Sequence, residues 1–484
     1  MKSFFNRFCC SFLFLFTAMT FNQTIAQVTA YTLEAAVDSA LSNNDKIKQY
    51  RHKVHQKEEL NDAAFGNYLP SVGVVAGYSY FSDNPEVNMS QVKESIDNVA
   101  GYYGADIAKA LGLSDQTQEA LQKLITGSLN KLPAYNIVID QQQYPNLNIV
   151  ALQPLYTGGK IMAGKRFAEA EFELSHIELK TVKDEIIRET VERYLAVALL
   201  KRVVSTRKEV VSGMKHHERD AKKAIDVGFI APHQILRAQV AVANAERDLD
   251  DDQNKLSLAL LALRTSMALD PEESFEISDS LVYRPVDLSI DGLKDEAQLN
   301  NPVFAMIKQK KTMVNQKYAL DRSEFLPQIG AFGTYNFFRE EYPVIPPRFI
   351  VGVQMNINLF HGMQDYHKLQ ASKYLKKEVN QAEIYAQKQI DLLINKAYRD
   401  VINYQTRYEK FAPTEKLAKK NYEINEKRFK EGLAKSTDVI DARLLYEGAQ
   451  LERLHSLYEY YQALVRLYVA TGNPHKIVNL LKGM

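Results

Sequence analysis

The sequence predicts a mainly α-helical fold with a membrane β portion, built from a duplicated helix-strand-strand-helix-helix unit. Three observations support this prediction. A set of short motifs occurs twice, in the same order, along the 484 residues. Long segments carry apolar residues at helical spacing, and two short segments in each copy alternate apolar with polar residues. Such a duplication indicates two copies of one unit, neither of which can bury its apolar face alone.

The N-terminus has the composition of a secretory signal peptide, which we expect over residues 1–26. Basic residues stand at its start, an apolar stretch follows, and Thr24-Ile25-Ala26 forms a small-residue cleavage site. The apolar stretch is shorter than the roughly 18 residues of a membrane helix, although an uncleaved anchor is the alternative. Both cysteines, Cys9 and Cys10, fall in this segment. The mature chain would therefore have no disulfide and no thiolate metal site.

Each copy opens with a helix that ends at a Leu-Pro pair, because proline lacks an N–H and disfavours helix in the residue before it. In the first repeat, residues 27–270, Thr32 is the candidate N-cap and the helix runs to about Gly66. In the second repeat, residues 291–472, the matching helix begins near Asp291.

Two alternating segments of about ten residues follow each leading helix, the length that a membrane β-strand needs. In the last of them Val351 and Val353 alternate with Gly352 and Gln354, and Tyr and Phe gather at the strand ends. That placement is typical of aromatic girdles, although a half-buried soluble sheet would show the same alternation. The strands are expected over about 70–81, 147–156, 327–338 and 349–360.

An insertion distinguishes the first copy from the second. It covers about residues 84–144, between the first two strands, whereas the matching loop covers only about 339–348. Residues 96–113 and 117–129 within it show helical patterning. The sequence leaves open whether the insertion covers a pore mouth or decorates the surface.

A long helix and a shorter return helix complete each copy, with a turn at Gly228 or Gly432 between them. Glycine suits these turns because it adopts positive φ at little cost. Long helices without internal stop signals are typical of coiled-coil-like assemblies. The expected helices cover about 160–227, 234–268, 364–431 and 438–470. We expect residues 271–290 to be a non-periodic connector and residues 473–484 to be a C-terminal tail.

The composition does not favour catalysis or nucleic-acid binding. Lys and Arg number 60 and Asp and Glu 59, so no basic footprint stands out. Thr157-Gly-Gly-Lys160 lacks the spacing of a phosphate loop. The pairs His52/His55 and His216/His217 are expected on solvated helix faces, because no carboxylate or thiol cluster completes a metal site. We therefore expect that the protein is not an enzyme and that it has no cofactor, no metal site and no nucleic-acid partner.

The segment around Gly432 resembles the turn motif of the TolC-type outer membrane efflux proteins, in which an aromatic residue precedes a glycine by three positions and Asp-Val-Leu-x-Ala follows. Here it reads Arg428-Phe-Lys-Glu-Gly432-Leu-Ala-Lys-Ser-Thr-Asp438-Val-Ile-Asp441-Ala-Arg-Leu-Leu445. The order of the strand pairs and the duplicated halves agree with that family. The resemblance covers about Thr32 to Asn473, nearly the whole mature chain.

The resemblance implies a homotrimer whose chains each give four strands to a twelve-stranded barrel in the outer membrane, above an α-helical tunnel in the periplasm. It implies outer membrane lipid, a periplasmic adaptor (membrane fusion) protein and an inner-membrane transporter as partners. The implied function is a porin-like, passive exit duct of a tripartite efflux or type I secretion system, for small molecules or polypeptides. The alternative is an exported structural coiled-coil protein without channel activity.

The resemblance also places a periplasmic entrance at the hairpin ends. Asp438 and Asp441 lie three residues apart, so they share a helix face, and carboxylates around a narrow mouth favour cations. For Asp438, N-capping of the return helix is the alternative. Gln234 and Arg237 occupy the matching positions of the first copy, and the family's acidic and basic latch residues are absent. Arg237 could instead pair with Asp441.

Overall fold

The computed structural model describes residues 29–84, 86–88, 90–96, 98–99, 111, 114–129, 131, 136–138, 140, 142–228, 230–270, 273–340 and 345–482. The expected signal peptide, with Cys9 and Cys10, lies outside these residues, as does most of the helix expected over 96–113. The chain divides into two compact units. The first comprises residues 1–57, 171–311 and 378–484, and the second comprises residues 58–170 and 312–377.

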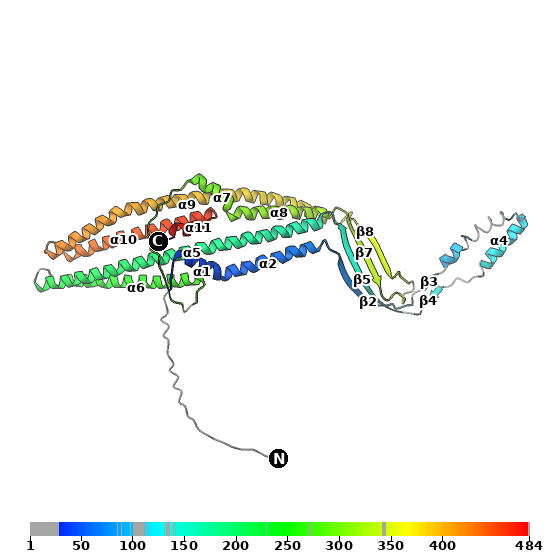
Figure 1. Cartoon of the computed structure of the whole chain (residues 1–484), viewed down its shortest axis with the longest axis horizontal. Coiled ribbons are helices and arrows are strands. Elements are labelled where there is room, and N and C mark those ends of the chain that lie inside the picture. Colours follow the sequence, from blue (N-terminus) through cyan, green and yellow to red (C-terminus); the bar gives the residue numbers. More distant parts are fainter. Residues whose placement is uncertain are drawn as a thin grey trace, which may run out of the picture. The chain divides into compact units, whose positions relative to one another are not determined.

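The second unit contains a four-stranded antiparallel sheet in the order β2-β5-β7-β8 (Figure 1). Its strands are β2 (Ser71–Tyr80), β5 (Gln143–Tyr156), β7 (Gln328–Asn336) and β8 (Phe349–Asn356). The strand β5 begins earlier than the expected residue 147, because Tyr144 is buried and pairs with Ser79. The strand β8 ends at Asn356 rather than at the expected residue 360, and Leu359 beyond it is exposed.

The register of the sheet gives it one continuous apolar face. Val72 and Val74 of β2 stand opposite Ala151 and Ile149 of β5, and the same face continues across β7 to Val353 of β8. These side chains are not covered within the chain: Val72 is 69% and Val353 is 66% exposed. An apolar face with this exposure needs an apolar environment that comes from outside the chain.

The insertion contains more structure than its helical patterning predicts. The helix α4 covers Asp115–Leu129, close to the expected 117–129. The short strands β3 (Glu86–Asn88) and β4 (Asn136–Val138) pair antiparallel, which the sequence did not reveal. Three-residue strands are too short to show a period.

The prediction of one leading helix per copy is wrong, because each splits into two. The first copy has α1 (Leu33–Asn43) and α2 (Asp45–Gly66), and the second has α7 (Ile290–Asn300) and α8 (Pro302–Ser323). Asn44 and Asn301 adopt extended backbone at the breaks. Each side-chain oxygen accepts a hydrogen bond, 2.9 Å long, from the backbone N–H two residues later. This contact caps the following helix.

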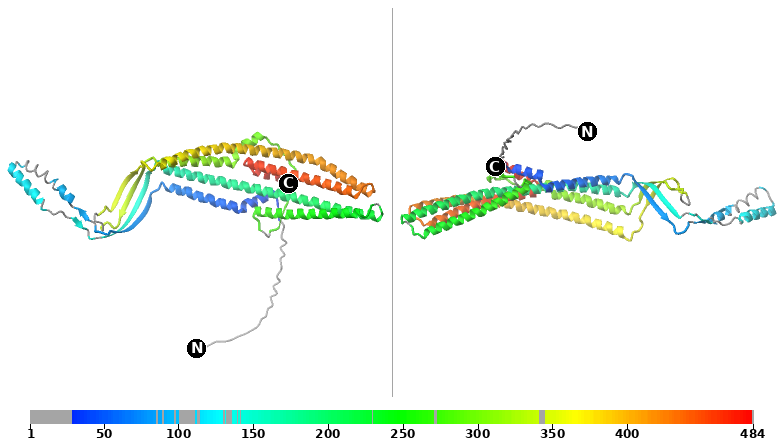
Figure 2. Two further views of the ribbon diagram at one scale, coloured as in Figure 1. Left: turned by 180° about the vertical axis from the view of Figure 1, so that it is seen from behind. Right: turned by 90° about the horizontal axis from the view of Figure 1, so that it is seen from below.

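The long helices and their return helices form two hairpins (Figure 2). The first hairpin is α5 (Lys160–Asp226) and α6 (Gln234–Met267), and the second is α9 (Gln364–Lys430) and α10 (Ser436–Ala470). The prediction that the long helices contain no stop signal is wrong for α9, because Pro413 lies inside this helix and does not end it. Within the described ranges, we find no helix long and apolar enough to cross a membrane.

The connector and the tail belong to the core of the first unit, contrary to the predicted non-periodic connector and plain tail. The strand β6 (Phe275–Ile277) pairs in parallel with β1 (Thr29–Tyr31), and both ends of β6 are buried. The helix α11 (His475–Leu481) buries Ile477 and Leu481 completely. Both elements join a cluster that also contains residues of α1, α5, α9 and α10.

Candidate functional site

The hairpin turns depend on the backbone freedom of glycine. Gly228 has φ +73° and Gly432 has φ +75°, and a Cβ built on either would meet no atom within 4 Å. The requirement is therefore one of backbone conformation and not of space, and other residues would lose about 1 kcal/mol or more there. The N–H of each glycine donates to the carbonyl three residues earlier, which ends the long helix.

The two hairpins pack against each other near their turns. One residue from each of the four helices contributes to a small apolar cluster: Ala221 of α5, Ala238 of α6, Phe429 of α9 and Val439 of α10. All four are at most 6% exposed. Their burial ties the end of the first hairpin to the end of the second.

A buried histidine crosses the same junction. His217 of α5 is 7% exposed, and its Nε2 lies 2.7 Å from the hydroxyl oxygen of Ser436, the first residue of α10. The ring of Phe429 lies edge-on at 4.7 Å. The expectation of a solvated surface is therefore wrong for His217, because its partners come from the other hairpin, about two hundred residues away in sequence. Its neighbour His216 is exposed and contacts Asp220.

Acidification should weaken this junction. Burial lowers the pKa of His217 most strongly, and nearby His216 also lowers it, whereas Asp220, Glu426 and the contact with Ser436 oppose them. In the unfolded state the imidazole of His217 has a pKa of about 6.5 and binds the proton more readily. The contribution of His217 to folding stability is therefore complete above about pH 6.5 and decreases as the pH falls toward the lowered pKa.

This pH effect can be measured by hydrogen exchange at pH 7.5 and 5.5. Amides around His217 and Ser436 should exchange faster at the lower pH in the wild type, after correction for the chemical rate. His217→Gln keeps a polar partner for Ser436 but cannot take up a proton, so its protection should change little. An equal loss of protection in both proteins would mean that other groups titrate.

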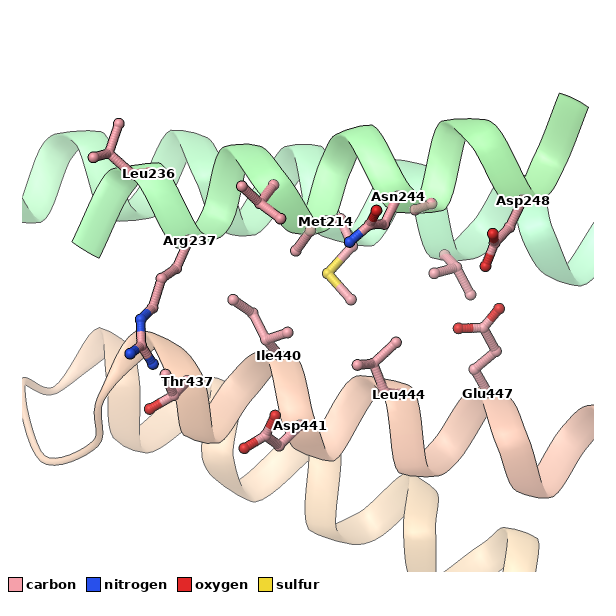
Figure 3. A pocket seen from close by; sticks show the side chains of 14 residues that line it. Met214, Leu236, Arg237, Asn244, Asp248, Thr437, Ile440, Asp441, Leu444 and Glu447 are labelled. Carbon is pink, nitrogen blue, oxygen red and sulfur yellow. The ribbon is translucent and has the colours of Figure 1, made fainter. Parts of the chain in front are cut away.

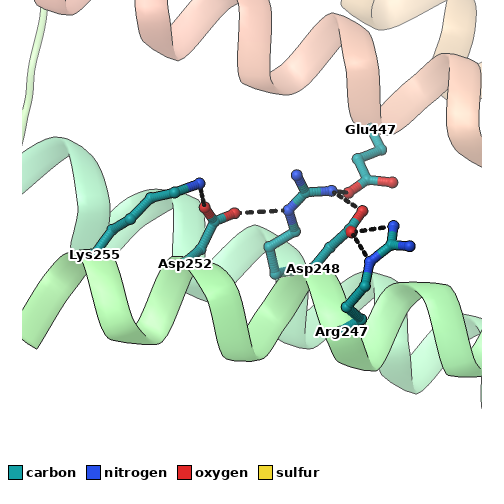
Figure 4. Close-up of polar contacts among 6 residues, drawn as sticks. Arg247, Asp248, Asp252, Lys255 and Glu447 are labelled. Atoms are coloured by element: carbon teal, nitrogen blue, oxygen red, sulfur yellow. Dashed lines mark hydrogen bonds and ion pairs between the residues drawn. The ribbon is translucent and has the colours of Figure 1, made fainter.

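An ion cluster holds the hairpins together further from the turns. The Nε of Arg207, on α5, donates to Asp252 of α6 at 2.9 Å, and its guanidinium also pairs with Asp248 of α6 at 3.4 Å and with Glu447 of α10. Figure 4 shows Asp252 also contacting Lys255, at 2.7 Å. One guanidinium thus joins three helices of two hairpins.

The two carboxylates at the centre of this cluster are buried: Asp252 and Glu447 are each 5% exposed. Burial alone would raise the pKa of Asp252, but the hydrogen bonds from Lys255 and Arg207 outweigh it and lower that pKa. The acidic run around Asp252 was visible in the sequence, yet nothing in it identified Arg207 as the partner.

Gln234 and Asp438 support the start of α10. The side-chain oxygen of Gln234, the first residue of α6, accepts from the N–H of Ser436 at 3.5 Å. The alternative assignment of Asp438 as the N-cap is wrong, because α10 begins at Ser436 and its N-cap is Lys435. Asp438 occupies the third helical position and accepts the N–H of Lys435 at 2.9 Å, which is a capping-box contact. Its side chain is exposed.

Arg237 and Asp441 lie in one groove between α5, α6 and α10, with a cavity volume of about 460 Å³ (Figure 3). Both side chains are exposed. The groove has an apolar floor that includes Met214, Val240 and Ile440. Within the described part of the chain no ion pair joins Arg237 to Asp441, so the expected pairing is not formed inside one chain.

Among the residues that the structure describes, no group of three or more His, Cys, Asp or Glu is arranged to hold a metal ion. The polar groups near the hairpin ends include carboxylates, the imidazoles of His216, His217 and His233, and the cationic groups of Arg and Lys. The buried members of this set hold helices of the two hairpins together.

The chain is similar to proteins of one family. A family model described as outer membrane efflux protein matches residues 139–269 and 293–473. A structure of the outer-membrane channel OprN superposes with TM-score 0.72 at 14% identity, covering 91% of this chain and 90% of that one. The CmeC outer membrane channel of Campylobacter jejuni gives TM-score 0.68 at 16% identity, with coverages of 91% and 86%.

A third similar structure is the outer membrane protein VceC of Vibrio cholerae, with TM-score 0.69, 15% identity and coverages of 91% and 96%. No curated protein sequence matches the chain. At these identities the structural likeness establishes the fold, and the family match rests on the sequence itself.

Proposed function

Because the chain belongs to the outer membrane efflux protein family, whose model matches most of its length, we propose that it is the passive exit duct of a tripartite efflux or type I secretion system. It would carry small molecules or polypeptides from the periplasm to the exterior. Its location is the outer membrane, and its helical hairpins would form the periplasmic tunnel. A periplasmic adaptor and an inner-membrane transporter would complete the system.

The observation that carries this proposal is the four-stranded sheet with its exposed apolar face. Its edge strands are β2 and β8, and among the residues that the structure describes no further strand pairs with the backbone N–H and C=O groups of either edge. Unpaired backbone groups of this kind are not tolerated in lipid, so the sheet must close. Three copies pairing β8 of one with β2 of the next would give twelve strands, which supports a homotrimer.

The hairpin ends supply the other half of the proposal. In a trimer, the exposed carboxylates of Asp438 and Asp441 would be repeated three times around the periplasmic entrance, together with Arg237 and Gln234. A ring of charges at a constriction selects ions because the field there is poorly screened. We therefore propose that this entrance favours cations, and that the turns at Gly228 and Gly432 present the hairpin ends to the adaptor.

The mass of the purified protein tests this assembly. Extraction from membranes should require detergent, and the protein should run as a trimer with its β signal intact, because a single chain has too few strands to close a barrel. Light scattering corrected for bound detergent gives the protein mass. A monomer that stays soluble without detergent and keeps its β signal would favour the alternative, an exported structural coiled-coil protein.

A further inference from the structure

The second face of the sheet is uncharged and mixes polar with apolar side chains. The register places amide and hydroxyl side chains on it, opposite the apolar face: Ser71, Ser79, Asn146, Asn148, Gln328, Thr334, Asn336, Gln354 and Asn356. The other positions of this face are Tyr144 and glycine, proline or apolar residues such as Val150, Leu152 and Phe332. All four strands consist of residues other than Asp, Glu, Lys, Arg and His, although charged residues make up 25% of the chain.

This face is also flat at two places where a side chain would otherwise project. A Cβ added at Gly77 would lie 2.8 Å from the side-chain oxygen of Asn146 on the paired strand. A Cβ added at Gly352 would lie 2.7 Å from the ring of Phe332. In both pairs the glycine makes room for its neighbour's side chain to lie along the sheet. Glycine in a strand interior often marks such a close approach.

We propose that this amide-lined face is the wall of the exit and that the exit passes cargo of either charge sign. The inference rests on the proposed function, because the apolar face must contact lipid for the polar face to line the interior. Amides both donate and accept hydrogen bonds, so they solvate cations and anions alike. Charge preference would then come from residues outside this sheet, and Asp438 and Asp441 of the proposed entrance are the candidates for it.

Reaction of single cysteines with charged thiol reagents tests this wall. Asn148→Cys and Ile149→Cys place a thiol on adjacent residues of opposite faces, in a Cys9→Ser, Cys10→Ser background. Each trimer is reconstituted in liposomes and treated with a trimethylammonium or a sulfonate methanethiosulfonate. In each case the thiolate attacks the reagent sulfur, forms a mixed disulfide and releases methanesulfinate. Intact mass gives the rates, and 2-mercaptoethanol gives the intrinsic ratio of the two reagents.

Asn148→Cys should react with both reagents, and the cation-to-anion rate ratio should lie within about threefold of that for 2-mercaptoethanol. A wall of one charge sign would change the ratio by about tenfold or more, and that result would overturn the proposal. Ile149→Cys should react with neither reagent. Reaction of Ile149→Cys but not of Asn148→Cys would show that the amide-lined face does not line the interior. The proposed function is tested separately, by the mass of the trimer and by its conductance.

Discussion

Replacing Arg207 with Met is expected to loosen the two hairpins more than any other single change at their contact. The substitution leaves Glu447 without its charged partner and leaves Asp252 with Lys255 alone. Removing one member of a buried ion pair typically costs about 3–5 kcal/mol, because a buried charge is left uncompensated. Hydrogen exchange of the amides in α6 and α10 around these residues should therefore accelerate by about 100-fold or more.

A surface ion pair of the same hairpin supplies the control. Lys215 pairs with Glu246 at 2.6 Å, and both side chains are nearly half exposed. Lys215→Met should cost about 0–1 kcal/mol, because exposed pairs contribute little. Adding Glu447→Leu and Asp252→Leu to Arg207→Met should restore part of the protection, since apolar groups need no counter-charge. Equal exchange in the Arg207→Met and Lys215→Met variants would mean that the cluster does not hold the hairpins together.

The second large effect is expected at the entrance. Asp438→Asn with Asp441→Asn should lower the cation-over-anion permeability ratio by about tenfold, since charge lining a narrow mouth concentrates counter-ions by that order or more. Multivalent cations added on the periplasmic side should also block less. Reversal potentials in a salt gradient give the ratio directly.

Two further variants separate charge from structure. Asp438→Asn alone should keep the start of α10, because an asparagine oxygen can still accept the N–H of Lys435. Glu423→Gln removes an exposed carboxylate of α9 and should leave the permeability ratio unchanged. If the double variant conducts with the wild-type ratio, its carboxylates lie off the conduction path and the cation filter is refuted.

Much of the fold was predictable because its signals are local or periodic. The strands of the sheet follow from alternation, and the turns follow from glycines at Gly228 and Gly432, which do have positive φ. The split of the leading helices was not predictable from periodicity. The apolar pattern continues through Asn44 and Asn301. The breaks are marked instead by the side-chain oxygens that cap the next helix and, in the second copy, by Pro302 at the first position of α8.

The site was less predictable, because its strongest contacts join residues that are distant in sequence. His217 looks like a surface residue until Ser436 and Phe429 from the other hairpin cover it. Arg207 is likewise one basic residue among many on α5, and only the packing of α6 and α10 brings its carboxylates together. Asp438 and Asp441 are predicted as entrance residues from the turn motif, and a motif identifies positions in the sequence without giving their contacts in the fold.

The most direct test of the central claim is single-channel recording of the purified wild-type protein in a planar lipid bilayer. If the protein is an exit duct, the detergent-solubilised trimer should insert and give discrete, uniform current steps, and the Asp438→Asn, Asp441→Asn variant should give steps with less cation preference. Insertion of intact trimer without any current step, under conditions where a known porin conducts, would contradict the account.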